Sequence, residues 1–185
     1  HARGNLRNEA LARGVLPDRL IFAPGLPQAE HLARLPAIDL MLDTWPYNAH
    51  TTASDALWAG VPLVTCAGST FASRVAGGLL LAAGLPEAVT TTPEAYRALA
   101  LSLARDPSCL ADLRMRFASS RRAAALFNVV AYTGALEAMY ARMWARHEAG
   151  LAPEAIDMAG DAGYGATAVS GEPWTLKLAW GESGH

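Results

Sequence analysis

The sequence of 185 residues is poor in cysteine, carries little net charge and contains no long apolar run. Two cysteines, Cys66 and Cys109, are too few and too scattered for a disulfide framework or a metal site, which favours a reducing compartment. No apolar run approaches the roughly 18 residues of a membrane-spanning helix, and the first residues lack the apolar core of a secretion signal. We therefore expect a cytoplasmic protein without membrane contact.

Several motifs of nucleotide and hydrolase chemistry are also missing. The sequence has no Gly-x-Gly-x-x-Gly after its first strand-like segment, no Walker loop and no Gly-x-Ser-x-Gly elbow, and its five histidines show no paired metal-ligand spacing. These absences disfavour hydride transfer, kinase-type transfer, serine hydrolysis and zinc catalysis. The formal net charge of -2 gives no general reason to bind nucleic acid, so any phosphate binding must be local.

Short apolar segments alternate with helical patterns over the first hundred residues. The patterns predict strands at 19–23, 39–43, 63–66 and 88–90, and helices at 4–13, 27–34, 52–59, 71–83 and from 92. Such alternation is typical of an α/β fold with a Rossmann-like, doubly wound parallel sheet and right-handed crossovers. With 52% hydrophobic residues, the chain is large enough to bury a substantial core.

The character of the sequence changes after this alternating part. Beyond Pro107 it is helical, so we expect closing helices over about 107–149, with a packing face formed by Leu136, Met139, Tyr140, Met143 and Trp144. We assign residues 1–150 to one lobe and 151–185 to an Ala/Gly-rich extension, where alternating apolar residues favour a late strand or a partner contact at 174–180. Because the chain begins without methionine in a helical pattern, we expect a further N-terminal part.

The most informative segment is 42–62, which reads as strand, loop, helix start and next strand. His50, Thr51 and Thr52 lie where the helix begins, and Asp55 lies one turn inside. Unpaired N–H groups and the macrodipole at such a helix start favour a phosphate, and ligands of open α/β sheets collect at the carboxyl ends of strands. The segment therefore predicts a nucleotide diphosphate site, with Asp55 accepting from a ribose hydroxyl.

Structural alternatives remain open for these residues. Thr52 to Asp55 also fits a capping box, in which the Asp55 carboxylate reaches back to the helix N-terminus. Gln28, His31 and Arg34 share one edge of a predicted helix, which is either a solvated edge or a ligand-facing one.

Several segments taken together closely resemble the C-terminal catalytic half of the O-GlcNAc transferases. The matching segments are Phe22-Ala23-Pro24, Pro27-x-x-Glu30-His31, Leu42-Asp43-Thr44, Asn48-Ala49-His50-Thr51-Thr52, Asp55-Ala56-Leu57-Trp58-Ala59-Gly60-Val61-Pro62, Ala72-Ser73-Arg74-Val75-Ala76, Leu126-Phe127-Asn128 and Met143-Trp144, over roughly residues 5 to 150. The resemblance implies the nucleotide-sugar-binding lobe of a GT-B glycosyltransferase. The resemblance implies that the whole enzyme would transfer GlcNAc from UDP-GlcNAc to Ser/Thr hydroxyls of acceptor proteins, with inversion and without a metal ion or other cofactor.

The resemblance also assigns roles to residues by matching position. His31 would pack against the uracil, Leu26 would offer backbone hydrogen bonds to the base, and Arg34 would lie beside it. His50, Thr51 and Thr52 would surround the diphosphate and sugar, and Asp55 would bind the ribose. The catalytic residues are expected upstream of this chain, in an N-terminal lobe preceded by tetratricopeptide repeats, so this segment alone is expected to be inactive.

One residue departs from the family pattern, because Gln28 stands where the animal enzymes usually have a lysine. The short loops look bacterial rather than animal. Two alternatives therefore stay open: a SPINDLY-like protein O-fucosyltransferase that uses GDP-fucose, and a non-catalytic nucleotide-binding scaffold.

Overall fold

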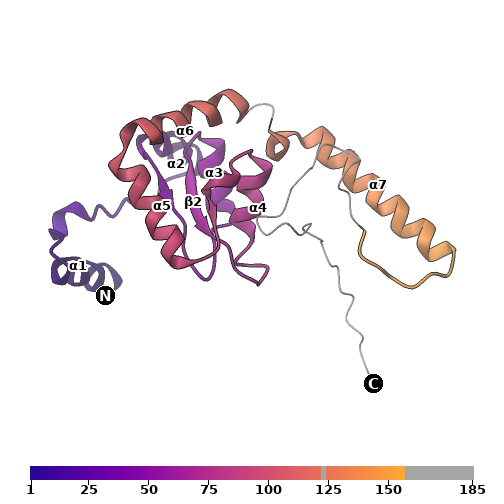
Figure 1. Ribbon diagram of the computed structural model, residues 1–185, viewed down its shortest axis with the longest axis horizontal. Helices are drawn as coiled ribbons and strands as arrows, with labels where there is room; N and C mark the ends of the chain where they lie inside the picture. Colours follow the sequence, from indigo (N-terminus) through magenta and orange to yellow (C-terminus); the bar gives the residue numbers. More distant parts are fainter. Residues whose placement is uncertain (122–123, 157–185) are drawn as a thin grey trace, which may run out of the picture. The chain divides into compact units, whose positions relative to one another are not determined.

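The computed structural model describes residues 1–121 and 124–156 (Figure 1). The chain divides into two compact units, His1–Arg34 and the part from Leu35 onward, and each is described by itself. The strand expected at 174–180 lies outside the described residues, as does most of the predicted extension. Over the described ranges, no helix combines the length and the apolar character needed to cross a membrane.

The first unit contains two helices joined by an irregular segment. They are α1 (Ala2–Ala12) and α2 (Gln28–Arg34), with a short 3-10 helix, η1 (Pro17–Arg19), between them. The strand predicted at 19–23 is wrong, because this segment pairs with no other strand of the described chain and Ile21 is 89% exposed. An apolar run becomes a strand only when a neighbour satisfies its backbone groups. The Phe22 ring instead lies below the guanidinium groups of Arg3 and Arg7.

The second unit is built on a three-stranded parallel sheet in the order β1-β2-β3. Its strands are β1 (Met41–Leu42), β2 (Leu63–Cys66) and β3 (Val89–Thr90), and the crossovers contain α3 (Thr51–Trp58) and α4 (Val75–Ala82). Figure 1 shows α5 (Pro93–Arg105) on one side of β2, and α3 and α4 on the other. The alternating pattern of the sequence therefore forms the parallel α/β sheet that it predicts.

Every residue of β2 is buried, which is why this strand is mostly apolar, and its polar residue, Thr65, bonds to Asp43. The core around it contains Phe117, Leu57, Leu63 and Leu80, each fully or almost fully buried. At the end of α3 the backbone of Gly60 has φ +81°, a conformation that favours glycine, as the predicted stop at this residue requires.

Helix α4 begins at Val75, four residues later than the predicted start at Phe71. The preceding residues form a turn, in which Gly68 N–H donates to the Ser73 carbonyl at 2.9 Å and Thr70 N–H donates to the Ser73 hydroxyl at 3.1 Å. Hydroxyl side chains often compete with helical hydrogen bonds in this way, which explains the later start.

The remaining elements are helical, as predicted for the part beyond Pro107. They are α6 (Pro107–Ser120), the short 3-10 helix η5 (Ala125–Phe127) and α7 (Val129–Glu148), besides the short 3-10 helices η2 (Leu35–Ala37) and η3 (Pro86–Ala88). The Thr92 hydroxyl accepts from Ala95 N–H and caps α5 as the sequence predicts. Helix α7 has no buried residue, and its Tyr140 and Trp144 are more than half exposed. Leu136, Met139 and Met143 are half-buried, so the described part of the chain covers the predicted packing face of α7 only in part.

Asp106 caps the start of α6 and makes its stability depend on pH. Its carboxylate accepts hydrogen bonds from the Ser108 side chain and from backbone N–H groups, chiefly that of Cys109, and these bonds lower the pKa of Asp106 below its usual 3.8. The stabilisation is fully present above the unfolded-state pKa and is lost as the pH falls through the folded-state pKa.

Asp106→Ala is therefore expected to lower Tm at pH 7 by about 2–4 °C, because the cap is lost. The difference in Tm from the unmodified chain should shrink as the pH is lowered from about 4 toward 2, since the protonated carboxyl caps poorly. Thermal unfolding followed by circular dichroism measures this difference. Asp112→Ala, an exposed change on the same helix, is the control. A difference that persists at pH 2 would contradict the prediction.

Candidate nucleotide-binding site

The buried carboxylate of Asp43 organises the loop that follows β1. Its Oδ1 accepts the N–H groups of Thr44 at 2.8 Å and Ala49 at 2.7 Å, and its Oδ2 accepts the Thr65 hydroxyl at 2.6 Å. Asp43 is only 6% exposed, so these bonds lie largely out of water. The carboxylate therefore joins both ends of loop 44–49 to each other and to β2.

Asn48 fixes the same loop from within. Its Nδ2 donates to the carbonyls of Thr44 at 2.8 Å and Cys66 at 3.3 Å, and its backbone N–H donates to the Ala72 carbonyl at 3.0 Å. These bonds connect the loops that follow β1 and β2. Asn48 is 1% exposed, and its Oδ1 has no partner among the described residues.

The loop ends at the first turn of α3. His50 is the N-cap residue, with φ -109° and ψ -91°, and its side chain makes no capping hydrogen bond. The capping box considered as an alternative would need Thr52 as the N-cap, so the observed start at Thr51 contradicts it. Thr51 and Thr52 are exposed and Asp55 is half-buried. The first-turn N–H groups and these polar side chains are thus placed for a ligand.

A pocket of about 470 Å³ lies at this helix start, and its wall contains three of the predicted site residues. The lining residues are Met41, Leu42, Asp43, Thr44, Tyr47, Asn48, Ala49, His50, Thr51 and Thr52. The pocket therefore lies outside the carboxyl end of β1, where an open α/β sheet binds its ligands.

Two aromatic rings contact the imidazole of His50. The Tyr47 ring is stacked on it at 5.1 Å between centroids, and the Phe71 ring meets it edge-on at 6.0 Å. Sequence reasoning missed Tyr47 and Phe71 as part of the site, and it missed the role of Asp43 as well. An acidic residue directly after a buried strand was the available signal for Asp43, whereas no local pattern connects Phe71 with His50.

Two ionisable side chains, those of Tyr96 and Cys66, belong to residues that contact loop 44–49 or the residue before it. Tyr96 donates its hydroxyl to the Asp43 carbonyl at 2.9 Å, and burial raises the pKa of this phenol, with the negative charge of Asp43 adding to the effect. Burial likewise raises the pKa of the Cys66 thiol, although a hydrogen bond with Thr90 opposes the shift. Both groups therefore stay protonated near neutral pH and serve the packing of the site rather than nucleophilic chemistry.

The other predicted site residues belong to the first unit. Leu26 and Gln28 are exposed, and His31 and Arg34 are half-buried. Arg34 donates from Nη1 to the Pro24 carbonyl at 2.7 Å, and its Nη2 lies 2.9 Å from His31 Nδ1. The structure therefore brings His31 and Arg34 together. That these four residues share one site with His50, Thr51, Thr52 and Asp55 stays a prediction.

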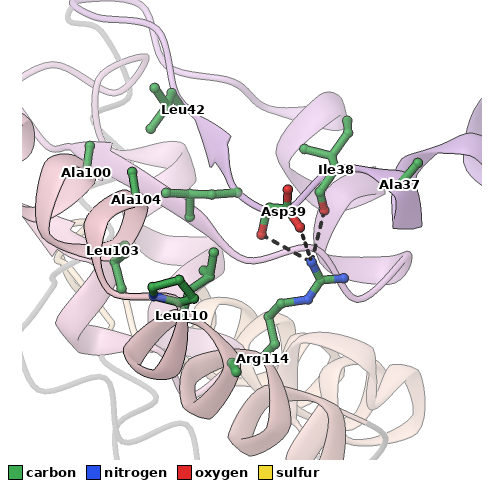
Figure 2. A pocket seen from close by; sticks show the side chains of 12 residues that line it. Ala37, Ile38, Asp39, Leu42, Ala100, Leu103, Ala104, Leu110 and Arg114 are labelled. Atoms are coloured by element: carbon green, nitrogen blue, oxygen red, sulfur yellow. Dashed lines mark hydrogen bonds and ion pairs between the residues drawn. The ribbon is translucent and has the colours of Figure 1, made fainter.

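A second pocket, of about 780 Å³, lies beside β1 and between α5 and α6 (Figure 2). Its wall is mainly apolar, and Arg114 Nη1 donates across it to the carbonyl oxygens of Ile38 and Asp39 and to the Asp39 carboxylate. None of the residues predicted to bind the nucleotide lines this pocket. The guanidinium of Arg114 in the larger pocket is already bonded to Ile38 and Asp39, whereas the smaller pocket contains the predicted residues His50, Thr51 and Thr52.

A parallel sheet with a polar loop and a helix N-terminus at the carboxyl end of a strand is the arrangement of a Rossmann-like α/β lobe. The sequence model of glycosyl transferase family 41 matches residues 1–136, so the chain belongs to this family. The resemblance inferred from the motifs is therefore confirmed.

Named relatives agree with this membership. The chain is 37% identical over 147 residues to a UDP-N-acetylglucosamine–peptide N-acetylglucosaminyltransferase of Caenorhabditis elegans, covering 80% of this chain and 13% of the relative. It is 39% identical over 149 residues to the probable Arabidopsis thaliana enzyme SEC, covering 80% of this chain and 15% of the relative. The chain thus spans only a small part of the curated relatives that it matches.

A solved structure confirms the fold class. A mutant of the Thermobaculum terrenum O-GlcNAc transferase superposes with a TM-score of 0.71 at 39% sequence identity, covering 77% of this chain and 27% of that chain. The predicted Rossmann-like α/β lobe of the GT-B kind is therefore correct.

Proposed function

We propose that the chain is the nucleotide-sugar-binding half of an inverting protein O-glycosyltransferase that moves GlcNAc from UDP-GlcNAc to Ser/Thr hydroxyls. One observation carries this proposal. The hydrogen bonds of Asp43 hold the loop before α3, and this loop places His50 and the first turn of α3 in the wall of a pocket of about 470 Å³. The C. elegans and A. thaliana relatives, both named as UDP-N-acetylglucosamine–peptide N-acetylglucosaminyltransferases, support UDP-GlcNAc as donor and a peptide as acceptor.

The proposed role of this helix start is to stabilise the departing diphosphate. Negative charge grows on the UDP as the sugar leaves, and preorganised donors in a partly dry site stabilise such charge strongly. The first-turn N–H groups of α3, the hydroxyls of Thr51 and Thr52 and the His50 imidazole would supply these donors. In this proposal no metal ion or other cofactor is needed, and Asp55 accepts a hydrogen bond from a ribose hydroxyl.

The residues of the first unit complete the donor site in this proposal. His31 packs against the uracil, with Arg34 holding the imidazole through the contact at 2.9 Å. Leu26 offers backbone hydrogen bonds to the base, and the neutral Gln28 lies near the ribose without adding a charge. The catalytic residues, an N-terminal lobe and tetratricopeptide repeats that hold the acceptor protein would lie in other parts of a cytoplasmic protein.

The proposal is tested by titrating UDP, and separately GDP, into the chain by calorimetry. Asp55→Ala is expected to weaken UDP binding by about 10- to 100-fold, because a hydrogen bond to a charged group contributes about 1.5–3 kcal/mol. Thr51→Val and Thr52→Val test the diphosphate contacts in the same way. Asp112→Ala, exposed on α6, is the matched control and should bind UDP like the unmodified chain.

The other outcomes separate the alternatives. A preference for GDP over UDP would favour the GDP-fucose-dependent O-fucosyltransferase. If neither this chain nor a longer protein that includes it bound UDP or GDP, the non-catalytic scaffold would be the remaining alternative. UDP binding that Asp55→Ala does not weaken would remove Asp55 from the ribose site.

A further inference from the structure

We propose that Tyr47 and Phe71 are positioning residues that clamp the imidazole of His50 at the edge of the diphosphate pocket. This inference rests on the proposed function of that pocket. It adds two side chains to a site that sequence motifs place only at His50, Thr51, Thr52 and Asp55.

The contacts of His50 are those of a ring held by packing. Tyr47 lies nearly parallel to the imidazole, with 20° between the ring planes and 5.1 Å between centroids, and Phe71 approaches edge-on at 6.0 Å and 80°. Both arrangements are the favourable ones for aromatic pairs. The Nε2 atom of His50 is buried and has no hydrogen-bond partner in the described chain. The ring contacts, and not a hydrogen bond at Nε2, therefore hold the imidazole among the described residues.

The backbone holds both rings in place. The Tyr47 carbonyl accepts the Thr44 hydroxyl at 2.6 Å, and the next residue, Asn48, is almost fully buried. The Ala72 carbonyl, directly after Phe71, accepts the Asn48 N–H at 3.0 Å. The clamp therefore joins the loops that follow two neighbouring strands, and its geometry is fixed by bonds that do not involve the rings themselves.

Burial in the core does not explain why aromatic residues occupy positions 47 and 71. Tyr47 is 66% exposed and Phe71 is 71% exposed, so each contributes little apolar burial to the folded state. A rigid imidazole, by contrast, loses less conformational freedom when a diphosphate binds. Ordering one such side chain weakens binding by about 3- to 10-fold, which is the effect expected when the clamp is removed.

The test is a double-mutant cycle on UDP affinity, measured by calorimetry. Tyr47→Ala and Phe71→Ala are each expected to weaken UDP binding by about 3- to 10-fold, whereas Tyr47→Phe keeps the ring and the affinity. In a His50→Ala background neither alanine change should weaken binding further, because no imidazole remains to be held. Trp45→Ala is the matched control, since Trp45 is 57% exposed in the same loop and makes no ring contact in the described chain.

Two results would overturn the clamp. One is an equal loss of affinity from Tyr47→Ala with and without His50. The other is a loss from Trp45→Ala as large as that from Tyr47→Ala.

A measurement on the free chain separates this inference from the proposed function. The carbon-bound protons of the His50 ring should show NMR ring-current shifts, which move toward random-coil values in Tyr47→Ala. If neither the unmodified chain nor a longer protein that includes it binds UDP, but these shifts are present and depend on Tyr47, the proposed function fails and the clamp stands. If the shifts are the same in both proteins, the clamp is wrong.

Discussion

Asp43→Ala is expected to lower the free energy of unfolding by about 3–5 kcal/mol and to abolish UDP binding. The change removes the acceptor of three hydrogen bonds, from Thr44 N–H, Ala49 N–H and the Thr65 hydroxyl. Thr65 is fully buried, so its hydroxyl would be left unsatisfied. The loss is a large share of the stability of an ordinary domain, and it falls on the loop that places His50.

Asp43→Asn is the informative control. The amide oxygen still accepts both backbone N–H groups, and the Thr65 hydroxyl accepts from the new NH₂ group, so we expect a loss of only about 1–2 kcal/mol. Urea unfolding measures the stability, and UDP titration below the midpoint of unfolding measures the site. If Asp43→Ala bound UDP as tightly as Asp43→Asn, the loop would not depend on this carboxylate.

Phe117→Ala is expected to destabilise the second unit by about 3–5 kcal/mol, through lost burial and the cavity left behind. Phe117 has no exposed surface and is the largest of the fully buried side chains of the described core. It lies on α6 and joins the cluster that includes Leu57, Leu63 and Leu80. No ligand contact is involved, so UDP affinity should stay unchanged under conditions where the variant is folded.

Met115→Ala, two residues earlier on α6, is the matched control because Met115 is 62% exposed. Its effect should stay within about 0.5 kcal/mol, as for most surface changes. Chemical unfolding monitored by circular dichroism compares the two. Equal losses for Phe117→Ala and Met115→Ala would show that α6 does not pack into the core as described.

The central part of the fold could be predicted from local sequence. The run Leu63–Cys66 is mostly apolar because β2 is covered on both faces, and it was predicted with the observed bounds. The stop of α3 at Gly60 and the cap of α5 at Thr92 follow from residue types with specific backbone or side-chain roles. Each of these signals depends on a few neighbouring residues only, so it can be recognised in the sequence without the tertiary structure.

Predictions were wrong where hydrogen bonds that the apolar pattern does not show decide the structure. Arg19 to Ala23 has the composition of a strand, yet in the described chain no neighbouring strand pairs with it. The start of α4 was placed too early, because the Ser73 and Thr70 hydroxyls turn the backbone before Val75. The first error reflects a missing strand partner in the described chain, and the second reflects local hydrogen bonds of hydroxyl side chains that compete with the helix.

The sequence by itself determined the order of the elements of the sheet, the family and the polar residues at the start of α3, because motif and periodicity are local properties. Only the tertiary structure decided how that helix start is held. Asp43 meets Thr65 across 22 positions, and Phe71 meets His50 across 21. These contacts exist because parallel pairing sets the carboxyl ends of β1 and β2 side by side, which no local pattern in the sequence specifies.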